Sequence, residues 1–484
     1  MHFASQRNWL NDPNGLVFHK GRYHLFFQYN PYGVGHGHMS WGHASSTDLV
    51  GWEEHPVALL ANEREEIYSG SAVVDETDSA GFGGVPGPAL VAVYTAHARN
   101  RRHQAQALAY SHDDGLTWTA YEGNPVLDRQ SGDFRDPKVF RYRGAAGEYW
   151  VMVAVEAADH AVVFYRSDDL RSWEYLSSYA QRGAVGGVWE CPDLFPLAVD
   201  GDPHDLRWVL LISLCPGGIA GGSGTQYVVG TFDGERFVPD EPMAPVFAAD
   251  EEPGYDELLA CSWLDFGRDC YAGVTFSGLP DEERTLIAWM SNWAYAPFLP
   301  VDAEAPQRGR MTLARRLSLS RRADGIRLVQ TPIVPRTEVS ARVAHRSIRP
   351  DAPLVASVAQ QAVVRVRLRV TDGAAELRFG DGHDVAVVVR VDGRDVTVDR
   401  RAGAAAAAEE FGSIERVRVE APGVLDAEIW LDTLSPLYGS LELFADAGAA
   451  VLTDLVIGAI SQVEVAAVGG VVEVDEVVIE VVAA

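Results

Sequence analysis

Three carboxylates stand in short polar motifs that are far apart along the chain. Asp12 lies in WLNDPNG, Asp136 in FRDPK and Glu190 in WECPD. Each has a proline or a bulky aromatic residue nearby, which fixes the backbone direction and limits side-chain rotamers, as catalysis by positioned groups requires. Two carboxyl groups held about 5 to 5.5 Å apart can cleave a glycosidic bond with retention, one as nucleophile and the other as acid.

Each motif taken alone also has an ordinary explanation. Asp-Pro is common turn chemistry, and Arg135 next to Asp136 could form a solvated ion pair. The positions of the three motifs favour the catalytic interpretation, because each of them begins an apolar segment at a matching place in a repeated pattern.

The repeated pattern consists of a polar cluster followed by a run typical of a strand. The clusters are NDPNGLVF from residue 11, YSGSAVV from 68, FRDPKVF from 134, WECPDLFPL from 189 and DCYAGVTF from 269. Variants of a Ser-x-Asp-x-x-Trp element also recur, at 46–52, 111–118 and 167–173. Repeats of roughly 55 to 80 residues with about four strands each are typical of β-propeller blades. Five starts predict five blades, and their innermost strands would gather the polar clusters around one axis.

The composition changes close to residues 332–337, where aromatic residues become rare and Val and Ala dominate. The segment VVRVRLRV, 363–370, alternates apolar residues with arginines, and the C-terminal segment from 463 has the same period of two. This period indicates half-buried antiparallel strands. We therefore predict an all-β chain, with a five-bladed β-propeller catalytic domain over 1–335 followed by a C-terminal β-sandwich over 336–484.

The charge of the chain excludes several partners. Its 484 residues include 40 Lys and Arg against 68 Asp and Glu, a net charge of −28, which repels polyphosphates and anionic lipids. No stretch approaches eighteen consecutive apolar residues. We expect no nucleic-acid and no membrane partner. We also expect a secreted protein whose signal peptide precedes this sequence, with a cytoplasmic location as the alternative; the sequence predicts no oligomeric state.

The motifs together resemble those of glycoside hydrolase family 32, which contains invertases, inulinases and levanases. WLNDPNG, FRDP and WECPD occur in order with QYNP, MSWGH, YSGSAV and WMSNWAY, and the similarity covers nearly the whole chain. Members of that family have a five-bladed propeller followed by a β-sandwich. The resemblance therefore implies the same architecture and a fructan or fructosyl-oligosaccharide substrate. We expect no cofactor.

The resemblance assigns a role to each carboxylate. It implies that Asp12 is the nucleophile, Glu190 the general acid and base, and Asp136 a stabiliser that binds fructose hydroxyls. Asp12 must be ionised in order to attack. Because Arg135 is adjacent, Asp136 should be held anionic and oppose the positive charge of an oxocarbenium-like transition state.

A fructose pocket is implied in the same way. Its residues are Asn11, Gln28, Trp41, Tyr68, Ser69, Arg135, Asp269 and Trp293. For Trp41 and Trp293, an ordinary core position is an equally good interpretation. His36 stands in GVGHGHMSWGH, close to where the family usually has Trp, so we expect it to replace an aromatic wall of the pocket and to alter substrate or acceptor preference.

Three histidines raise the question of a metal. His36, His38 and His43 could approach one another as ligands, but they coincide with the pocket motif. We therefore predict no metal site.

Three functions remain open. The chain as a whole resembles levan fructotransferases, and we expect this function first; in these enzymes a hydroxyl of the bound β-2,6-linked fructan attacks the covalent intermediate and yields difructose anhydride. The first alternative is an exo-acting levanase, inulinase or invertase, in which water attacks and releases terminal β-fructofuranosyl residues. The second is a catalytically dead fructan-binding protein. Loss of a carboxylate would favour this last function, but all three carboxylates are present.

Overall fold

The protein is almost entirely β-structure. The computed structural model describes residues 1–84, 87–144, 147–180, 183–184, 186–240, 253–402, 408–435 and 437–483. Over these ranges the one α-helix is the single turn α1 (Tyr255–Leu258), and short 3-10 turns occur in loops. No helix in the described part of the chain is long and apolar enough to cross a membrane.

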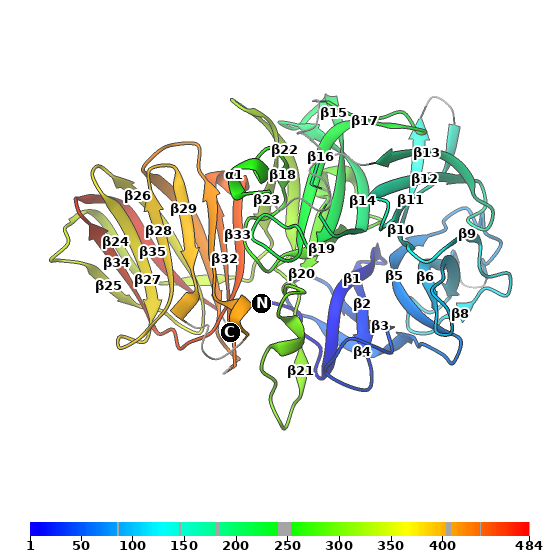
Figure 1. Ribbon diagram of the computed structural model, residues 1–484, viewed down its shortest axis with the longest axis horizontal. Coiled ribbons are helices and arrows are strands. Elements are labelled where there is room, and N and C mark those ends of the chain that lie inside the picture. The colour runs from blue at the N-terminus through cyan, green and yellow to red at the C-terminus, as the bar shows by residue number, and fades with distance from the viewer. Residues whose placement is uncertain are drawn as a thin grey trace.

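The N-terminal part is a five-bladed β-propeller (Figure 1). Blade 1 contains β1 (Asn8–His19), β2 (Arg22–Asn30), β3 (Ser40–Ser46) and β4 (Glu53–Leu59), with β21 (Gln307–Arg308) added beside β1. Blade 2 contains β5 (Glu65–Val74), β6 (Leu90–Ala98), β7 (Gln104–Ser111), β8 (Thr119–Ala120) and β9 (Leu127–Ser131). Blade 3 contains β10 (Phe134–Gly144), β11 (Gly147–Glu156), β12 (Ala161–Ser167) and β13 (Glu174–Ala180).

The last two blades share one sheet. Blade 4 contains β14 (Val188–Val199), β15 (Asp202–Cys215), β16 (Gly224–Phe232), β17 (Phe237–Pro239) and β18 (Ser262–Trp263). Blade 5 contains β19 (Tyr271–Thr275), β20 (Thr285–Trp289), β22 (Arg315–Arg322) and β23 (Gly325–Pro332). They are joined where Val199 pairs with Leu319 in parallel. The predicted all-β propeller is confirmed, and each predicted polar cluster lies at or beside the start of an innermost strand.

Neighbouring blades bury their apolar faces against each other. The cluster between blades 1 and 2, for example, packs Phe26 and Trp41 against Leu90 and Tyr94, and all four side chains are almost fully buried. A single blade cannot bury both of its faces, so the blades stabilise one another. The innermost strands are therefore buried on both sides even though they carry polar residues.

The recurrent Ser-Asp element is the turn after the third strand of blades 1 to 3. In blade 1, the hydroxyl of Ser46 donates to Asp48 (3.0 Å) and accepts the backbone amide of Leu49 (2.8 Å). In blade 3, Trp173 closes the turn by donating its indole N–H to the carbonyl of Leu170 (2.9 Å). These local side-chain bonds explain why Ser, Asp and Trp recur with this spacing.

The C-terminal part is a β-sandwich of two six-stranded antiparallel sheets. One sheet contains β24 (Thr337–Ile348), β35 (Val472–Val482), β26 (Gln361–Val370), β31 (Val424–Asp432), β32 (Gly439–Ala445) and β33 (Ala450–Val456). The other contains β25 (Leu354–Ser357), β34 (Gln462–Val468), β27 (Ala374–Gly380), β28 (Val385–Asp392), β29 (Asp395–Asp399) and β30 (Ile414–Arg418). The predicted boundary at 335/336 lies between β23 and β24.

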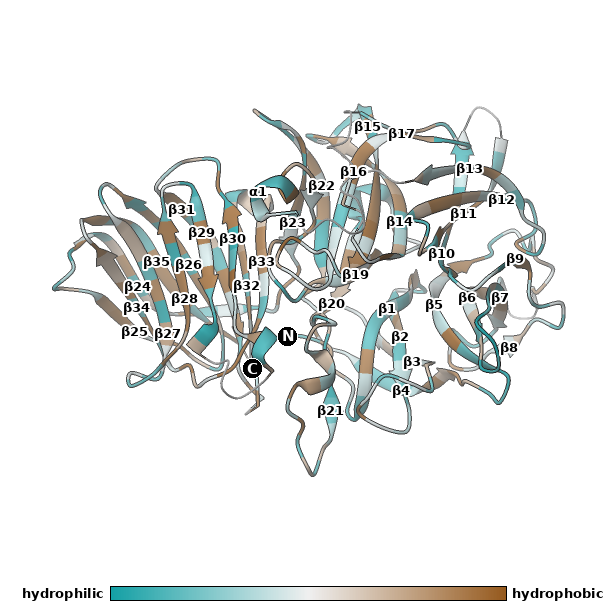
Figure 2. Ribbon diagram, in the orientation of Figure 1, coloured by the Kyte–Doolittle hydropathy of each residue, from teal (hydrophilic) through white to brown (hydrophobic). Residues whose placement is uncertain are grey.

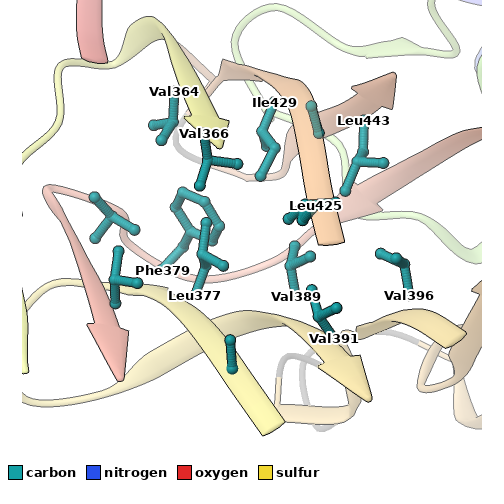
Figure 3. Packing of buried hydrophobic residues seen from close by; sticks show 14 of the residues in the cluster. Val364, Val366, Leu377, Phe379, Val389, Val391, Val396, Leu425, Ile429 and Leu443 are labelled. Atoms are coloured by element: carbon teal, nitrogen blue, oxygen red, sulfur yellow. The ribbon is translucent and has the colours of Figure 1, made fainter. Parts of the chain in front are cut away.

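The alternating pattern of the sandwich strands has the expected result. Apolar and polar residues alternate along these strands, as Figure 2 shows. Val364 and Val366 of β26 face Leu377 and Phe379 of β27 across the core (Figure 3). Arg365, between the two valines, points to the outer face and pairs there with two glutamates.

Candidate active site

All five innermost strands are irregular close to the residue at which each strand begins. In each one the antiparallel register shifts by a residue or more, at a β-bulge or a similar irregularity. The shifts fall between Leu10 and Pro13, Tyr68 and Gly70, Arg135 and Lys138, Glu190 and Asp193, and Tyr271 and Val274. Bulges are common near active sites because the local bend re-aims side chains. Proline lacks an amide donor, so Pro13, Pro137 and Pro192 fit positions where the ladder is broken.

Two of the three carboxylates contact one buried side chain, that of Cys191. Its Sγ lies 3.6 Å from Oδ2 of Asp12 and 3.7 Å from Oδ2 of Asp136. Glu190 precedes it in the chain. The structure therefore brings together residues from β1, β10 and β14, as the sequence pattern predicts.

Asp12 has an environment suited to a nucleophile. Ser69 donates its hydroxyl to Oδ2 of Asp12 (2.7 Å). Burial raises the pKa of Asp12 to about 6, the charge of Glu190 adds to the rise, and hydrogen bonds from Ser69, Asn11 and Cys191 oppose it. At pH 7 the carboxylate is therefore mainly ionised, and it is less strongly solvated than an exposed one.

Asp136 is held by one hydrogen bond from its own backbone amide and by another to its carboxylate. Its own φ is +62°, a left-handed conformation that is uncommon for Asp and is typical of strained functional positions. Its amide donates to Oγ1 of Thr95 (2.9 Å), and its Oδ2 accepts the amide of Cys191 (2.9 Å). These two bonds fix the carboxylate at the floor of the hub.

The expectation that Arg135 holds Asp136 anionic is wrong. Burial raises the pKa of Asp136 to about 7; Arg135 opposes this rise without overcoming it, and the charges of Glu190 and Asp12 add to it. The guanidinium lies 3.9 Å from Oδ2 of Asp136 but donates to Glu190 instead. The strongest interaction of Arg135 is thus with the neighbouring carboxylate.

A first prediction follows from this raised pKa. The group's stabilising contribution is full below its ordinary pKa of 3.8 and is lost as the pH rises through about 7, because the charged form is then buried. At pH 8, Asp136→Asn should therefore have a free energy of unfolding that is higher than that of the wild type by on the order of a few kcal/mol. Its melting temperature should be higher accordingly. At pH 4 the two melting temperatures should converge. Thermal denaturation at both pH values measures this, with the partly exposed Asp133→Asn as control. Equal or lower stability of Asp136→Asn at pH 8 would contradict the prediction.

Glu190 is oriented by two donors from different blades. Arg135 donates from Nη2 to Oε1 (3.1 Å), and Tyr271 donates its hydroxyl to Oε2 in a short hydrogen bond. The side chain keeps 24% of its surface exposed, so it can reach a ligand. Trp189 points to the opposite side, where it is buried and donates to the carbonyl of Ala184 (3.1 Å). An acid or base at this position is therefore accessible and fixed in direction.

Sequence reasoning missed Tyr271, Thr95 and Cys191. Tyr271 lies in the DCYAGVTF cluster, from which the sequence prediction selected Asp269 instead. A signal was present, because Tyr271 occupies the first position of its innermost strand, as Asp136 and Glu190 lie near the first positions of theirs.

Asp269 is not a pocket residue, contrary to the prediction. It is fully buried, accepts the hydroxyl of Tyr295 (2.5 Å) and accepts Nη1 of Arg400 and the amide of Leu455 from the sandwich (2.6 and 2.8 Å). A buried guanidinium is stable only when its charge and donors are matched, so Asp269 attaches the sandwich to the propeller.

Trp41 is also in the core, which was its ordinary interpretation. Its side chain is fully buried, packs against Phe26 and donates its indole N–H to the carbonyl of Tyr68 (3.0 Å). Gln28 is nearly as buried, and it donates to Asn14 (2.8 Å). Trp41 therefore supports the pocket from behind and does not touch a ligand.

Aromatic residues form the side of the site where the sequence predicts a pocket wall. Trp293 lies 5.7 Å from Trp9 and 5.3 Å from His36 between ring centroids. Trp9 in turn donates its indole N–H to Asn11 (2.7 Å). Burial lowers the pKa of His36, so this ring is neutral at pH 7. The predicted replacement of a wall residue by His36 is thus compatible with its place beside two tryptophans.

Tyr68 stands beside the carboxylates. Its ring is half-buried and stacks on His97, with centroids 4.5 Å apart and planes 11° apart. Burial raises the pKa of Tyr68 to about 12, so its hydroxyl remains a donor at any physiological pH.

The candidate metal ligands do not come together. His43 is fully buried, stacks on Phe26 and shares a hydrogen bond with His24 (3.1 Å between ring nitrogens). Across the described ranges, no group of three or more His, Cys, Asp or Glu side chains is placed to hold a metal ion.

A five-bladed propeller with three acidic side chains converging at one end of its hub is the architecture of a propeller glycoside hydrolase. The chain belongs to glycoside hydrolase family 32: the model of the "Glycosyl hydrolases family 32 N-terminal domain" matches residues 2–332.

Curated relatives have names consistent with this family. A levanase of Bacillus subtilis strain 168 is 46% identical over 336 residues, covering 69% of this chain and 46% of the relative. An extracellular exo-inulinase of Aspergillus niger is 42% identical over 367 residues, covering 70% of this chain and 65% of the relative. The chain thus spans between about half and two thirds of the length of these relatives.

A solved structure shares both domains. The exo-inulinase of Aspergillus awamori superposes with a TM-score of 0.87 at 32% identity, over 100% of this chain and 98% of the other. The shared coverage extends over the propeller and the sandwich.

Proposed function

We propose that this chain is a retaining β-fructofuranosidase that releases fructosyl units from fructans or fructosyl oligosaccharides. The observation that carries the proposal is the contact of Asp12 and Asp136 with Cys191, beside a Glu190 that two blades orient. The names levanase and exo-inulinase among the relatives support a fructan as the substrate.

The proposed reaction has two steps. Asp12 attacks the anomeric carbon of the fructosyl unit while Glu190 gives its proton to the departing glycosidic oxygen, which leaves a covalent fructosyl-enzyme. Glu190, now a carboxylate, takes a proton from water as the water attacks that carbon and releases Asp12. Arg135 and Tyr271 hold Glu190 in one direction through both steps.

The fructosyl group of the covalent intermediate could also be transferred to a hydroxyl of the substrate itself. If a hydroxyl of the bound fructan reaches the intermediate before water does, the product is difructose anhydride and the enzyme is a levan fructotransferase. His36 in place of a wall tryptophan favours this second candidate, because a smaller polar ring changes the space beside the intermediate. The names of the relatives favour water.

Product identification distinguishes these candidates. The protein is incubated with levan, inulin and sucrose, and the products are separated by chromatography and identified by mass spectrometry. We expect free fructose from at least one fructan. Difructose anhydride as the main product from levan would show that the enzyme is a fructotransferase and not a hydrolase. Absence of any product with all three substrates would contradict both.

We further propose that the protein is secreted, as the word "extracellular" in the names of several exo-inulinase relatives supports.

A further inference from the structure

A second cavity lies at the end of the propeller hub opposite the carboxylates. Its volume is about 640 Å³, within the range of small-molecule sites. The innermost strands begin at the carboxylates and reach this cavity with their later residues. Phe18, Val74, Arg141, Phe195 and Ser277 line it, one at or after the later part of the innermost strand of each blade.

The cavity is closed off from the active site. Lys138 is almost fully buried between the two, where its Nζ lies 3.0 Å from Asp193 and donates to the carbonyl of Thr275. Above Lys138 is a void of about 10 Å³, which Asp136 and Cys191 also line and which has room for about one water molecule. A sugar chain cannot pass through the hub, so a ligand of the rear cavity would bind independently of catalysis.

Flat aromatic and guanidinium surfaces form part of the cavity wall. Trp208 and Phe140 are half-buried with ring centroids 5.7 Å apart, and Trp208 is fixed from behind by Phe232 at 5.1 Å. Arg141 lies over the ring of Trp150 at 4.9 Å. Such fixed planar groups offer apolar area at low entropic cost, which suits the C–H faces of sugar rings.

The cations around the cavity are paired. Each cation that lines it has a carboxylate partner; the pairs are Lys20–Asp114, Lys138–Asp193, Arg141–Glu148, Arg143–Glu148 and Arg284–Asp281. Of these carboxylates only Asp281 lines the cavity, together with the exposed Glu76; Asp114, Asp193 and Glu148 lie outside the lining. Because each of these cations is already paired with a carboxylate, the site gives little advantage to a phosphate or another anion. It offers paired donors and acceptors to a neutral ligand that is rich in hydroxyl groups.

We propose that this cavity is a second, non-catalytic binding site for a neutral fructan chain. The proposal rests on the proposed function, because it assumes that the front site processes the same polymer. A chain that is held at the rear raises the effective concentration of substrate at the front, without any change in the chemistry. Short substrates, which cannot occupy both sites, would gain nothing from it.

Binding stoichiometry tests the proposal directly. In a Glu190→Gln background, isothermal titration with the neutral fructosyl oligosaccharide nystose should give two sites per chain. Adding Trp208→Ala should leave one site, and Glu76→Ala should weaken the same site. Trp173→Ala, which removes a half-buried tryptophan elsewhere in blade 3, should leave both. One site in the Glu190→Gln protein, or competition for the second site by inorganic phosphate, would overturn the proposal.

Steady-state kinetics distinguish loss of the rear site from a general loss of folded protein, because misfolding would also lower kcat and the activity on sucrose. In the otherwise wild-type protein, Trp208→Ala and Glu76→Ala should raise KM for polymeric fructan by at least about fivefold and leave kcat and all constants for sucrose unchanged. Unchanged KM for the polymer in the folded Glu76→Ala protein would overturn the proposal. Failure of the wild type to cleave any fructan or sucrose would instead defeat the proposed function, whatever the binding stoichiometry.

Discussion

Asp12→Asn should lower kcat for fructan and sucrose cleavage by about four orders of magnitude or more, as the loss of a covalent nucleophile does in other enzymes. An amide cannot form the fructosyl-enzyme ester, and in this site no second carboxylate takes the same place, since Asp136 is tied to the amide of Cys191. The hydroxyl of Ser69 can still donate to the oxygen of the new amide, so the pocket should keep its shape. Initial rates with sucrose, measured by fructose release, give the result.

The matched control for this variant is Asp324→Asn, which makes the same chemical change on the surface, where Asp324 pairs with Arg327 (2.9 Å). The control should keep wild-type rates. The Asp12→Asn protein should still bind nystose in the titration described above and should unfold at a temperature no lower than the wild type, because a buried ionisable group is gone. Wild-type turnover by Asp12→Asn would remove this residue from its proposed role.

Glu190→Gln should lower kcat for sucrose by about 10²- to 10⁴-fold, the range over which general acid–base catalysis contributes. The glutamine side chain has the same size as the one it replaces, and its oxygen could still accept from Arg135 or Tyr271. It can neither give a proton to the leaving oxygen nor take one from water. Both steps should therefore be slow.

Two measurements separate this role from a structural one. A fructoside with a good leaving group, such as p-nitrophenol, needs no proton in the first step, so the Glu190→Gln deficit should shrink with it. Azide needs no base to attack, so it should restore turnover and yield fructosyl azide. The surface control Glu53→Gln, at an exposed partner of Arg22, should behave like the wild type. If the loss of kcat were equal for all substrates and unaffected by azide, Glu190 would not be the general acid and base.

Much of the propeller could be predicted because its signals are local. The chain repeats three local features: apolar runs, turn residues after them, and prolines at fixed places. Each of these features can be recognised without knowing which residues are its neighbours in space. The proline after Asp12, Asp136 and Cys191 marks the register shift in each strand. The three acidic residues could be selected for that reason.

The pocket residues that the structure places elsewhere, Asp269 and Trp41, were assigned to the pocket for one physical reason. Asp269 and Tyr271 are two residues apart, and only packing shows that the first turns to Arg400 of the sandwich while the second turns to Glu190. The same applies to Trp41, because an aromatic residue in a pocket motif can point to either face of its strand, toward the ligand or into the core. Sequence spacing does not say which face the neighbouring blade covers.

The amino-acid sequence by itself determined the all-β class, the five strand repeats, the alternating sandwich and the three carboxylates, because these depend on residue type and spacing along the chain. Only the tertiary structure decided that Tyr271 and Arg135 hold Glu190, that Asp136 has a raised pKa and that a cavity lies behind Lys138. These properties arise from burial and from contacts between residues on different blades, since the cost of a buried charge depends on everything that surrounds it.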